Sequence, residues 1–231
     1  MSDPLRIALV GASGLVGRAI IGLSVGREDF RLTGLARREM PLPQGARMEV
    51  FVAEPARWGE VFEATRPTAL ICALGTTWRK AGEDEAAFRA VDRDLVLETA
   101  RAAKAHGVER MVAISSAGAS LAARTFYLRV KGEMERDLAK IGFKRLDVLR
   151  PGLLRGVRGG ERRPAERIGI AVSPVTDLLL HGSWRRYRSI PARTVAEAAL
   201  SLAMRRAGGR FHHDNDGIRR AARELPQPVE A

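Results

Sequence analysis

A tyrosine, a lysine and a serine have the residue types and the spacing that a proton-transfer site needs. Tyr127 and Lys131 are four residues apart in "YLRVK", and Ser116 lies eleven residues before the tyrosine. On a helix, a spacing of four puts both side chains on one face, so an ammonium can lie beside the phenol. A neighbouring cation favours a phenolate, which suits a tyrosine to proton transfer at neutral pH. Taken alone, YxxxK is also compatible with surface or packing residues.

The serine follows an apolar run, "RMVAISS", that predicts a strand from Arg110 to Ser115. Neighbouring residues on a strand point to opposite faces, so only one of Ser115 and Ser116 should face a substrate. We assign this role to Ser116 and keep Ser115 as the alternative.

Three glycines near the start of the chain have the spacing of a phosphate-binding turn. In "IALVGASGLVGRAI", residues 7–20, an apolar run reaches Gly11, and a helix-like pattern begins just after Gly14, with Gly17 inside it. Glycine permits otherwise costly dihedral angles and lets backbone amides approach a pyrophosphate at a helix N-terminus. The alternative is an ordinary glycine-rich turn. Arg18 and the glycines interrupt the apolar run, so we expect neither a membrane span nor a signal peptide.

The next predicted strand, from Arg31 to Ala36, ends in "LARRE". In dinucleotide-binding folds this position distinguishes cofactors, because an acidic residue there accepts hydrogen bonds from a ribose 2′-hydroxyl. Arg37 and Arg38 can instead pair with a 2′-phosphate. The pattern favours NADPH over NADH, and its alternative is a pair of solvated loop arginines.

A further predicted strand, from Ala69 to Ala73, continues into "LGTT". In a doubly wound sheet the carboxyl ends of the strands border the ligand crevice. Gly75 would let the backbone pass close to a cofactor, and Thr76 and Thr77 would supply polar contacts. An ordinary turn is equally compatible with these residues.

The elements that must position these residues alternate between apolar runs and helix-like stretches, which is typical of βα units. We expect an α/β fold with a Rossmann-type doubly wound parallel sheet. Residues 1–231 would form a single domain, in which about 152–231 contribute a small C-terminal substrate region. The remaining strands are predicted at Leu5–Val10, Met48–Val52 and Arg145–Leu149, and the helices at Leu15–Val25, Trp58–Thr65, Glu85–His106, Arg124–Ile141 and Thr194–Arg206, with shorter ones around Pro174 and Ile218.

The formal net charge of +12 raises the question of nucleic-acid binding. The arginines are scattered, however, and the densest basic stretch, "RGVRGGERRPAER", contains two glutamates and no aromatic residue for base stacking. We therefore disfavour nucleic acid as a partner and keep an anionic small ligand open.

The single cysteine, Cys72, excludes an internal disulfide framework, so we expect a reducing compartment and a cytoplasmic protein. The cysteine lies in an apolar strand and is interpreted as a core residue. His212 and His213 are adjacent, and strand neighbours point to opposite faces, so no metal site is predicted.

Six segments occur in the order found in one known family: "GASGLVG", "LGTTWRKAG", "VDRDLVLETARAAKAHGV", "SSAGA", "YLRVKGEMER" and "LRPGLLRGVR". The chain resembles the atypical, epimerase-like branch of the short-chain dehydrogenase/reductase superfamily, and within it an oxidoreductase-like family. The resemblance covers roughly Leu5 to Val195, which is most of the chain.

This resemblance implies an NADP(H)-binding Rossmann domain and roles for single residues. Tyr127 would donate or accept a proton, Lys131 would hold the nicotinamide ribose and favour the ionised tyrosine, and Ser116 would orient the substrate. The implied cofactor contacts are Ser13, Gly14, Leu15 and Val16 at the pyrophosphate, Arg37 and Arg38 at the adenosine phosphate, Leu74 and Gly75 at the middle of the cofactor, and Leu154 and Arg163 as late contacts. The short C-terminal part argues against a large nucleotide sugar.

The sequence therefore predicts an NADPH-dependent reductase or dehydrogenase that acts on a carbonyl or alcohol of a small molecule. The alternative is an NADP(H)-binding sensor, regulator or scaffold that works through a protein partner, since a fold alone does not establish turnover.

Overall fold

The computed structural model describes residues 4–156 and 182–227. Seven parallel strands form one sheet in the order β3-β2-β1-β4-β5-β6-β9. The direction of winding reverses between β1 and β4, as in a doubly wound fold. The predicted Rossmann-type fold is confirmed. The strands are β1 (Leu5–Val10), β2 (Phe30–Ala36), β3 (Glu49–Val52), β4 (Ala69–Cys72), β5 (Arg110–Ile114), β6 (Arg145–Leu149) and β9 (Gly209–His213).

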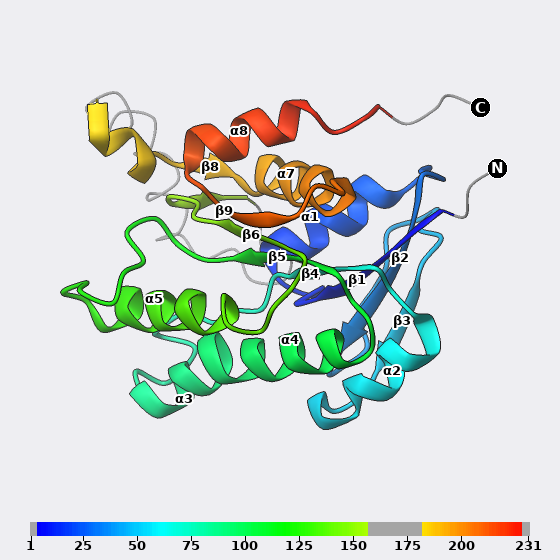
Figure 1. The fold of residues 1–231 in the computed structure, drawn as a ribbon, viewed down its shortest axis with the longest axis horizontal. Coiled ribbons are helices and arrows are strands. Elements are labelled where there is room, and N and C mark those ends of the chain that lie inside the picture. The colour runs from blue at the N-terminus through cyan, green and yellow to red at the C-terminus, as the bar shows by residue number, and fades with distance from the viewer. Residues whose placement is uncertain (1–3, 157–181, 228–231) are drawn as a thin grey trace.

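Helices cover both faces of the sheet (Figure 1). One layer contains α1 (Leu15–Ser24), α7 (Ala192–Met204) and α8 (Asn215–Arg223). The opposite layer contains α2 (Trp58–Thr65), α3 (Glu85–Arg89), α4 (Leu95–Ala105) and α5 (Phe126–Leu138). Because both faces are covered, central strands such as β4 and β6 are buried along their whole length. This burial explains the continuous apolar run of β4, whereas in β6 the two buried charged residues, Arg145 and Asp147, pair with each other.

The predicted helix from Glu85 to His106 contains an irregularity. Between α3 and α4, residues Ala90–Asp94 form a π turn, in which the backbone winds more widely than in an α-helix. The π turn contacts α5. It places Asp92 in the protein interior, where 1% of the surface of Asp92 is exposed.

The C-terminal part contributes directly to the sheet. The edge strand β9 pairs with β6, and α7 packs on α1. Strand β9 was not predicted, because "GRFHH" is mostly exposed and has no alternating pattern. The helix expected near Ile218 is α8, whose N-cap Asp214 accepts a hydrogen bond from the amide of Gly217. The helix expected near Pro174 lies outside the described residues. Two short strands that lie between β6 and β9 in the sequence, β7 (Leu154–Arg155) and β8 (Ile190–Pro191), pair with each other in a separate parallel sheet.

Candidate cofactor and catalytic site

A crevice lies at the carboxyl ends of β1, β4 and β5, beside the point where the winding of the sheet reverses. The glycine-rich turn, the loop after β4, the π turn and α5 all contribute to its wall. The structure thus brings together segments that lie more than 100 residues apart. The predicted site residues that line this crevice are Ser13, Gly14, Leu15, Val16, Leu74, Gly75, Tyr127, Lys131 and Leu154. Arg163 lies outside the described residues.

The glycine-rich turn requires glycine at two positions for steric reasons. Gly11 has a positive φ of 81°, and a Cβ there would lie 2.4 Å from the backbone of Ala73. A Cβ on Gly17 would lie 2.3 Å from the carbonyl oxygen of Gly11. Gly14 has an ordinary φ of −73° and caps α1 without a side-chain hydrogen bond. The first amides of α1 therefore face the crevice without a side-chain cap, as an anion site requires.

The arginines predicted to recognise the adenosine phosphate follow β2. Arg37 and Arg38 are exposed and do not line the crevice itself. Arg18 on α1 does line it, and its Nε donates to the carbonyl oxygen of Ser13 across 3.0 Å. Sequence reasoning missed Arg18, because its charge was considered only as an interruption of an apolar run.

Tyr127 and Lys131 occupy one face of α5, as their spacing predicts. The ring of Tyr127 packs against Phe88 with 5.5 Å between centroids. Lys131 is buried, and its Nζ lies 2.7 Å from Oδ1 of Asp92. Burial lowers the pKa of Lys131, but the charges of Asp92 and Tyr127 outweigh it, so the net pKa is raised above the ordinary value. Lys131 is therefore a buried ammonium beside the phenol.

Of the two serines after β5, Ser115 is on the crevice wall and Ser116 is not. Ser115 is buried, and its Oγ donates to Oε1 of Glu135 across 2.5 Å. The structure therefore favours the alternative serine for a role beside Tyr127. The choice could not be made from sequence, because the strand ends at Ile114 and the facing of the next two residues depends on the loop.

Glu135 is buried and is the centre of a polar cluster behind Ser115. Nε of Arg150 donates to both carboxylate oxygens of Glu135, at 3.0 and 3.1 Å, and Nε2 of His212 lies 3.7 Å away. Burial, followed by the charge of Arg150, lowers the pKa of His212. A weak signal for this cluster was present in the sequence, since Glu135 follows Lys131 by four residues and shares its helix face.

Asp92 lies within one of the six family segments but was not among the predicted site residues. It follows Phe88 and precedes Val96 by four residues each, and both neighbours are buried. A carboxylate on the apolar face of a helix needs a partner, because an unpaired buried charge is costly. That spacing was the signal that could have identified it.

The single cysteine and the two adjacent histidines have structural roles outside the crevice wall. Cys72 is buried, and this burial raises the pKa of its thiol to about 11, so the thiol is not activated as a nucleophile. His213 lies 2.8 Å from Asp147, whereas His212 faces Glu135, so the two adjacent histidines have different partners.

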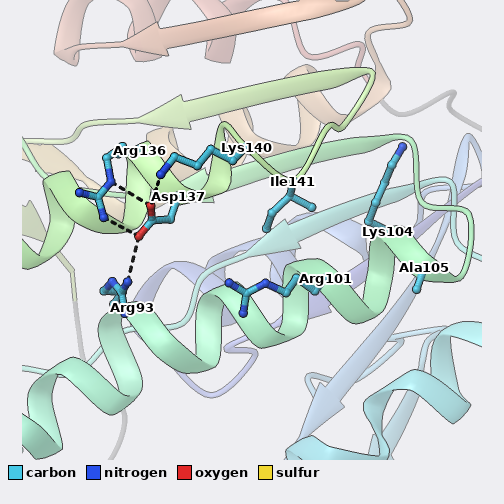
Figure 2. A pocket seen from close by; sticks show the side chains of 8 residues that line it. All are labelled: Arg93, Arg101, Lys104, Ala105, Arg136, Asp137, Lys140 and Ile141. Atoms are coloured by element: carbon cyan, nitrogen blue, oxygen red, sulfur yellow. Dashed lines mark hydrogen bonds and ion pairs between the residues drawn. The ribbon is translucent and has the colours of Figure 1, made fainter.

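A second hollow lies between α4 and α5, away from the crevice (Figure 2). Asp137 accepts hydrogen bonds there from three basic side chains, those of Arg93, Arg136 and Lys140. The bond from Arg136, followed by those from Lys140 and Arg93, outweighs burial and holds the pKa of Asp137 well below its usual range. Arg101 and Lys104 add further positive charge. This hollow contains none of the predicted site residues.

A family profile described as NAD(P)H-binding matches residues 11–167, more than half of the chain. The chain is 35% identical over 206 residues to protein fmp52, mitochondrial, of Aspergillus clavatus. This match spans 84% of this chain and 87% of that protein. It is also 35% identical over 199 residues to protein HTATIP2 of Rattus norvegicus, with 84% and 79% covered.

A solved UDP-glucose 4-epimerase of Thermotoga maritima superposes with a TM-score of 0.68 over 97% of this chain and 85% of that one. Its sequence identity is 14%, so this likeness concerns the fold alone.

The predicted cytoplasmic location is wrong, because curated relatives are named as mitochondrial proteins. A lone cysteine indicates only the lack of internal disulfides, which does not distinguish one reducing compartment from another. Within residues 4–156 and 182–227, no helix has the length and apolar character to cross a bilayer. From the family match and these relatives, the chain belongs to the NAD(P)H-binding family, as an atypical short-chain dehydrogenase/reductase.

Proposed function

We propose that this protein is an NADPH-dependent oxidoreductase that interconverts a carbonyl and an alcohol on a small molecule. The observation that carries the proposal is the position of Tyr127 and Lys131 on the same crevice as the glycine-rich turn. The close backbone approaches at Gly11 and Gly17 fit a turn that holds a pyrophosphate. When bound, the reduced nicotinamide supplies a hydride to the carbonyl carbon.

The side chains of the crevice would complete the reduction. Tyr127 gives its phenolic proton to the carbonyl oxygen as that oxygen gains charge, and Lys131 stabilises the resulting phenolate and holds a ribose hydroxyl. Ser115 holds the substrate oxygen by a hydrogen bond. This assignment replaces Ser116, because Ser115 lines the crevice. Ser115 donates to Glu135 in the structure, so it must turn to donate to a substrate.

The preference for NADPH is supported by charge. Arg37 and Arg38 are exposed and follow β2, and Arg18 lines the crevice. Guanidinium groups can form bidentate, charge-assisted hydrogen bonds with a phosphate, which NADH lacks at the 2′ position.

A second candidate function is cofactor sensing through a protein partner. Two contacts favour it: Asp92 neutralises Lys131, and Glu135 accepts the hydrogen bond that Ser115 can donate. Both contacts leave the crevice less prepared for catalysis than an unpaired ammonium and a free hydroxyl would.

The deciding experiment follows NADPH oxidation by the purified chain across a panel of aldehydes, ketones and quinones. Tyr127→Phe is the matched control, because it removes only the phenolic hydroxyl. If the chain is an enzyme, we expect the unmodified protein to turn over at least one of these compounds. Turnover by Tyr127→Phe should then be at least about a hundredfold lower, because the variant lacks the general acid. Calorimetric titration should give nearly unchanged NADPH affinity.

Lys131→Met should impair both turnover and NADPH affinity. Tight NADPH binding without turnover on any member of the panel would favour the sensor. Near-normal turnover by Tyr127→Phe would rule out the proposed chemistry.

A further inference from the structure

The buried contact between Asp92 and Lys131 connects the π turn to α5. Asp92 is 1% exposed and Lys131 4% exposed by side-chain surface, and Oδ1 lies 2.7 Å from Nζ. The other carboxylate oxygen, Oδ2, accepts a hydrogen bond from the amide of Thr76 at 2.7 Å. Both oxygens of Asp92 are therefore used by groups that line the crevice.

We propose that Asp92 is a positioning residue that cancels the charge of Lys131 at Tyr127, and thereby sets the pH range in which Tyr127 exchanges its proton. The consequence for turnover rests on the proposed function. The effect on the ionisation of the phenol does not, and it can be measured without a substrate.

The ionisation of the half-buried phenol depends on the net charge of the buried pair of Asp92 and Lys131. With Asp92 ionised and Lys131 protonated, the pair is neutral, so ionising the phenol leaves one uncompensated negative charge. Without the carboxylate, the site holds one uncompensated positive charge, and losing the phenolic proton makes it neutral. An uncompensated charge is costly beside this buried pair, where screening is weaker than in water. The carboxylate therefore opposes ionisation of Tyr127.

Other ionisable groups face this site from the neighbouring elements. Cys72 on β4 stays a neutral thiol, because burial raises its pKa to about 11. Arg18 on α1 and Lys80 in the loop after β4 line the same crevice, but both are exposed and screened by water. On α5, Glu135 is paired with Arg150. Asp92 is the carboxylate that lies against the lysine.

The test uses the fact that the chain contains two tyrosines, Tyr127 and Tyr187. In a Tyr187→Phe background, the ultraviolet absorbance of phenolate reports Tyr127 alone. The pH at which this absorbance has risen halfway is called the absorbance step. We expect Asp92→Asn to move the absorbance step to lower pH by at least about one unit, a tenfold change in the ionisation constant of the phenol. Asp94→Asn is the matched control: it removes the same charge from the same π turn, but Asp94 is half-exposed and pairs with Arg93.

A double variant, Asp92→Asn with Lys131→Met, guards against a single variant that fails to fold, since it leaves no buried charge unpaired. If Asp92 cancels Lys131, removing both should leave the absorbance step close to that of the Tyr187→Phe parent. Asp92→Glu should also keep the parental step, because it keeps the charge. Circular dichroism checks the fold of each variant.

An unchanged step in folded Asp92→Asn would overturn the proposal, and so would a double variant whose step moves upward as far as that of Lys131→Met alone. If Lys131 in the Asp92→Asn variant loses its proton in place of Tyr127, no phenolate will appear at lower pH. This result would also contradict the proposal. If the chain proves to have no turnover, the absorbance result still stands. If turnover is found, its pH profile should move with the absorbance step.

Discussion

The hydroxyl of Ser115 donates a hydrogen bond to Glu135, with 2.5 Å between the two oxygens. Ser115 follows β5, and Glu135 lies on α5, so the bond connects the sheet to this helix. A serine hydroxyl has one proton, so while this bond exists Ser115 can only accept a further hydrogen bond. Glu135 in turn is held by Arg150. The serine beside Tyr127 is thus oriented by a carboxylate from the helix that carries Tyr127.

Glu135→Gln should lower the free energy of unfolding by about 1–3 kcal/mol, because Arg150 loses its charged acceptor and a buried charge-assisted hydrogen bond is weakened. Urea unfolding measures the change. The control is Glu60→Gln, which breaks an exposed pair with Arg57 and should cost less than about 0.5 kcal/mol. Equal small losses in both variants would show that the buried cluster has no special role in stability.

Replacing Arg37 and Arg38 together by alanine should remove most of the preference for NADPH over NADH. Each charge-assisted contact to the additional phosphate contributes roughly 1.5–3 kcal/mol. Calorimetric titration of both cofactors measures the preference. Arg47→Ala, an exposed arginine paired with Glu28, is the control for general loss of positive charge. Equal affinities of the unmodified protein for the two cofactors would contradict the NADPH assignment.

Gly14→Val and Gly17→Val should separate cofactor binding from folding. Gly14 has an ordinary φ, and its nearest contact for a Cβ is the oxygen of Gly11 at 3.2 Å, so the valine variant should fold but lose NADPH binding. A Cβ on Gly17 would meet backbone atoms at 2.3–2.8 Å, so Gly17→Val should destabilise the fold itself. Circular dichroism with NADPH titration distinguishes the two outcomes. Full NADPH affinity in folded Gly14→Val would place the phosphate site elsewhere.

The ion-pair network around Asp137 predicts a pH dependence of stability. Its pKa is depressed in the folded protein, so its stabilising contribution is present above the unfolded value near 4 and is lost as the pH falls toward the folded value. Asp137→Asn should cost about 1 kcal/mol at neutral pH and low salt, since several of the partners are exposed. Unfolding measured from neutral pH to pH 3 should show this difference shrinking. A constant difference would indicate that Asp137 acts through packing alone.

The order of strands and helices could be predicted because the information is local. A continuous apolar run marks the buried strand β4, mainly apolar residues mark β1, and the glycine spacing marks the turn after β1. The placement of Tyr127 and Lys131 together follows from helix geometry, which is also local. The edge strand β9 was missed because an exposed, polar strand is specified by its partner β6 and not by its own pattern.

The sequence by itself determined the Rossmann-type fold, the glycine-rich turn and the common helix face of Tyr127 and Lys131, since periodicity and steric limits act over a few residues. Only the tertiary structure decided that Ser115 and not Ser116 lines the crevice, and that Asp92 and Glu135 bond to Lys131 and Ser115. These pairings join segments 20 to 39 residues apart in sequence. Their partners are set by the packing of α5 and the π turn against the sheet, because buried polar groups must satisfy one another where water is excluded.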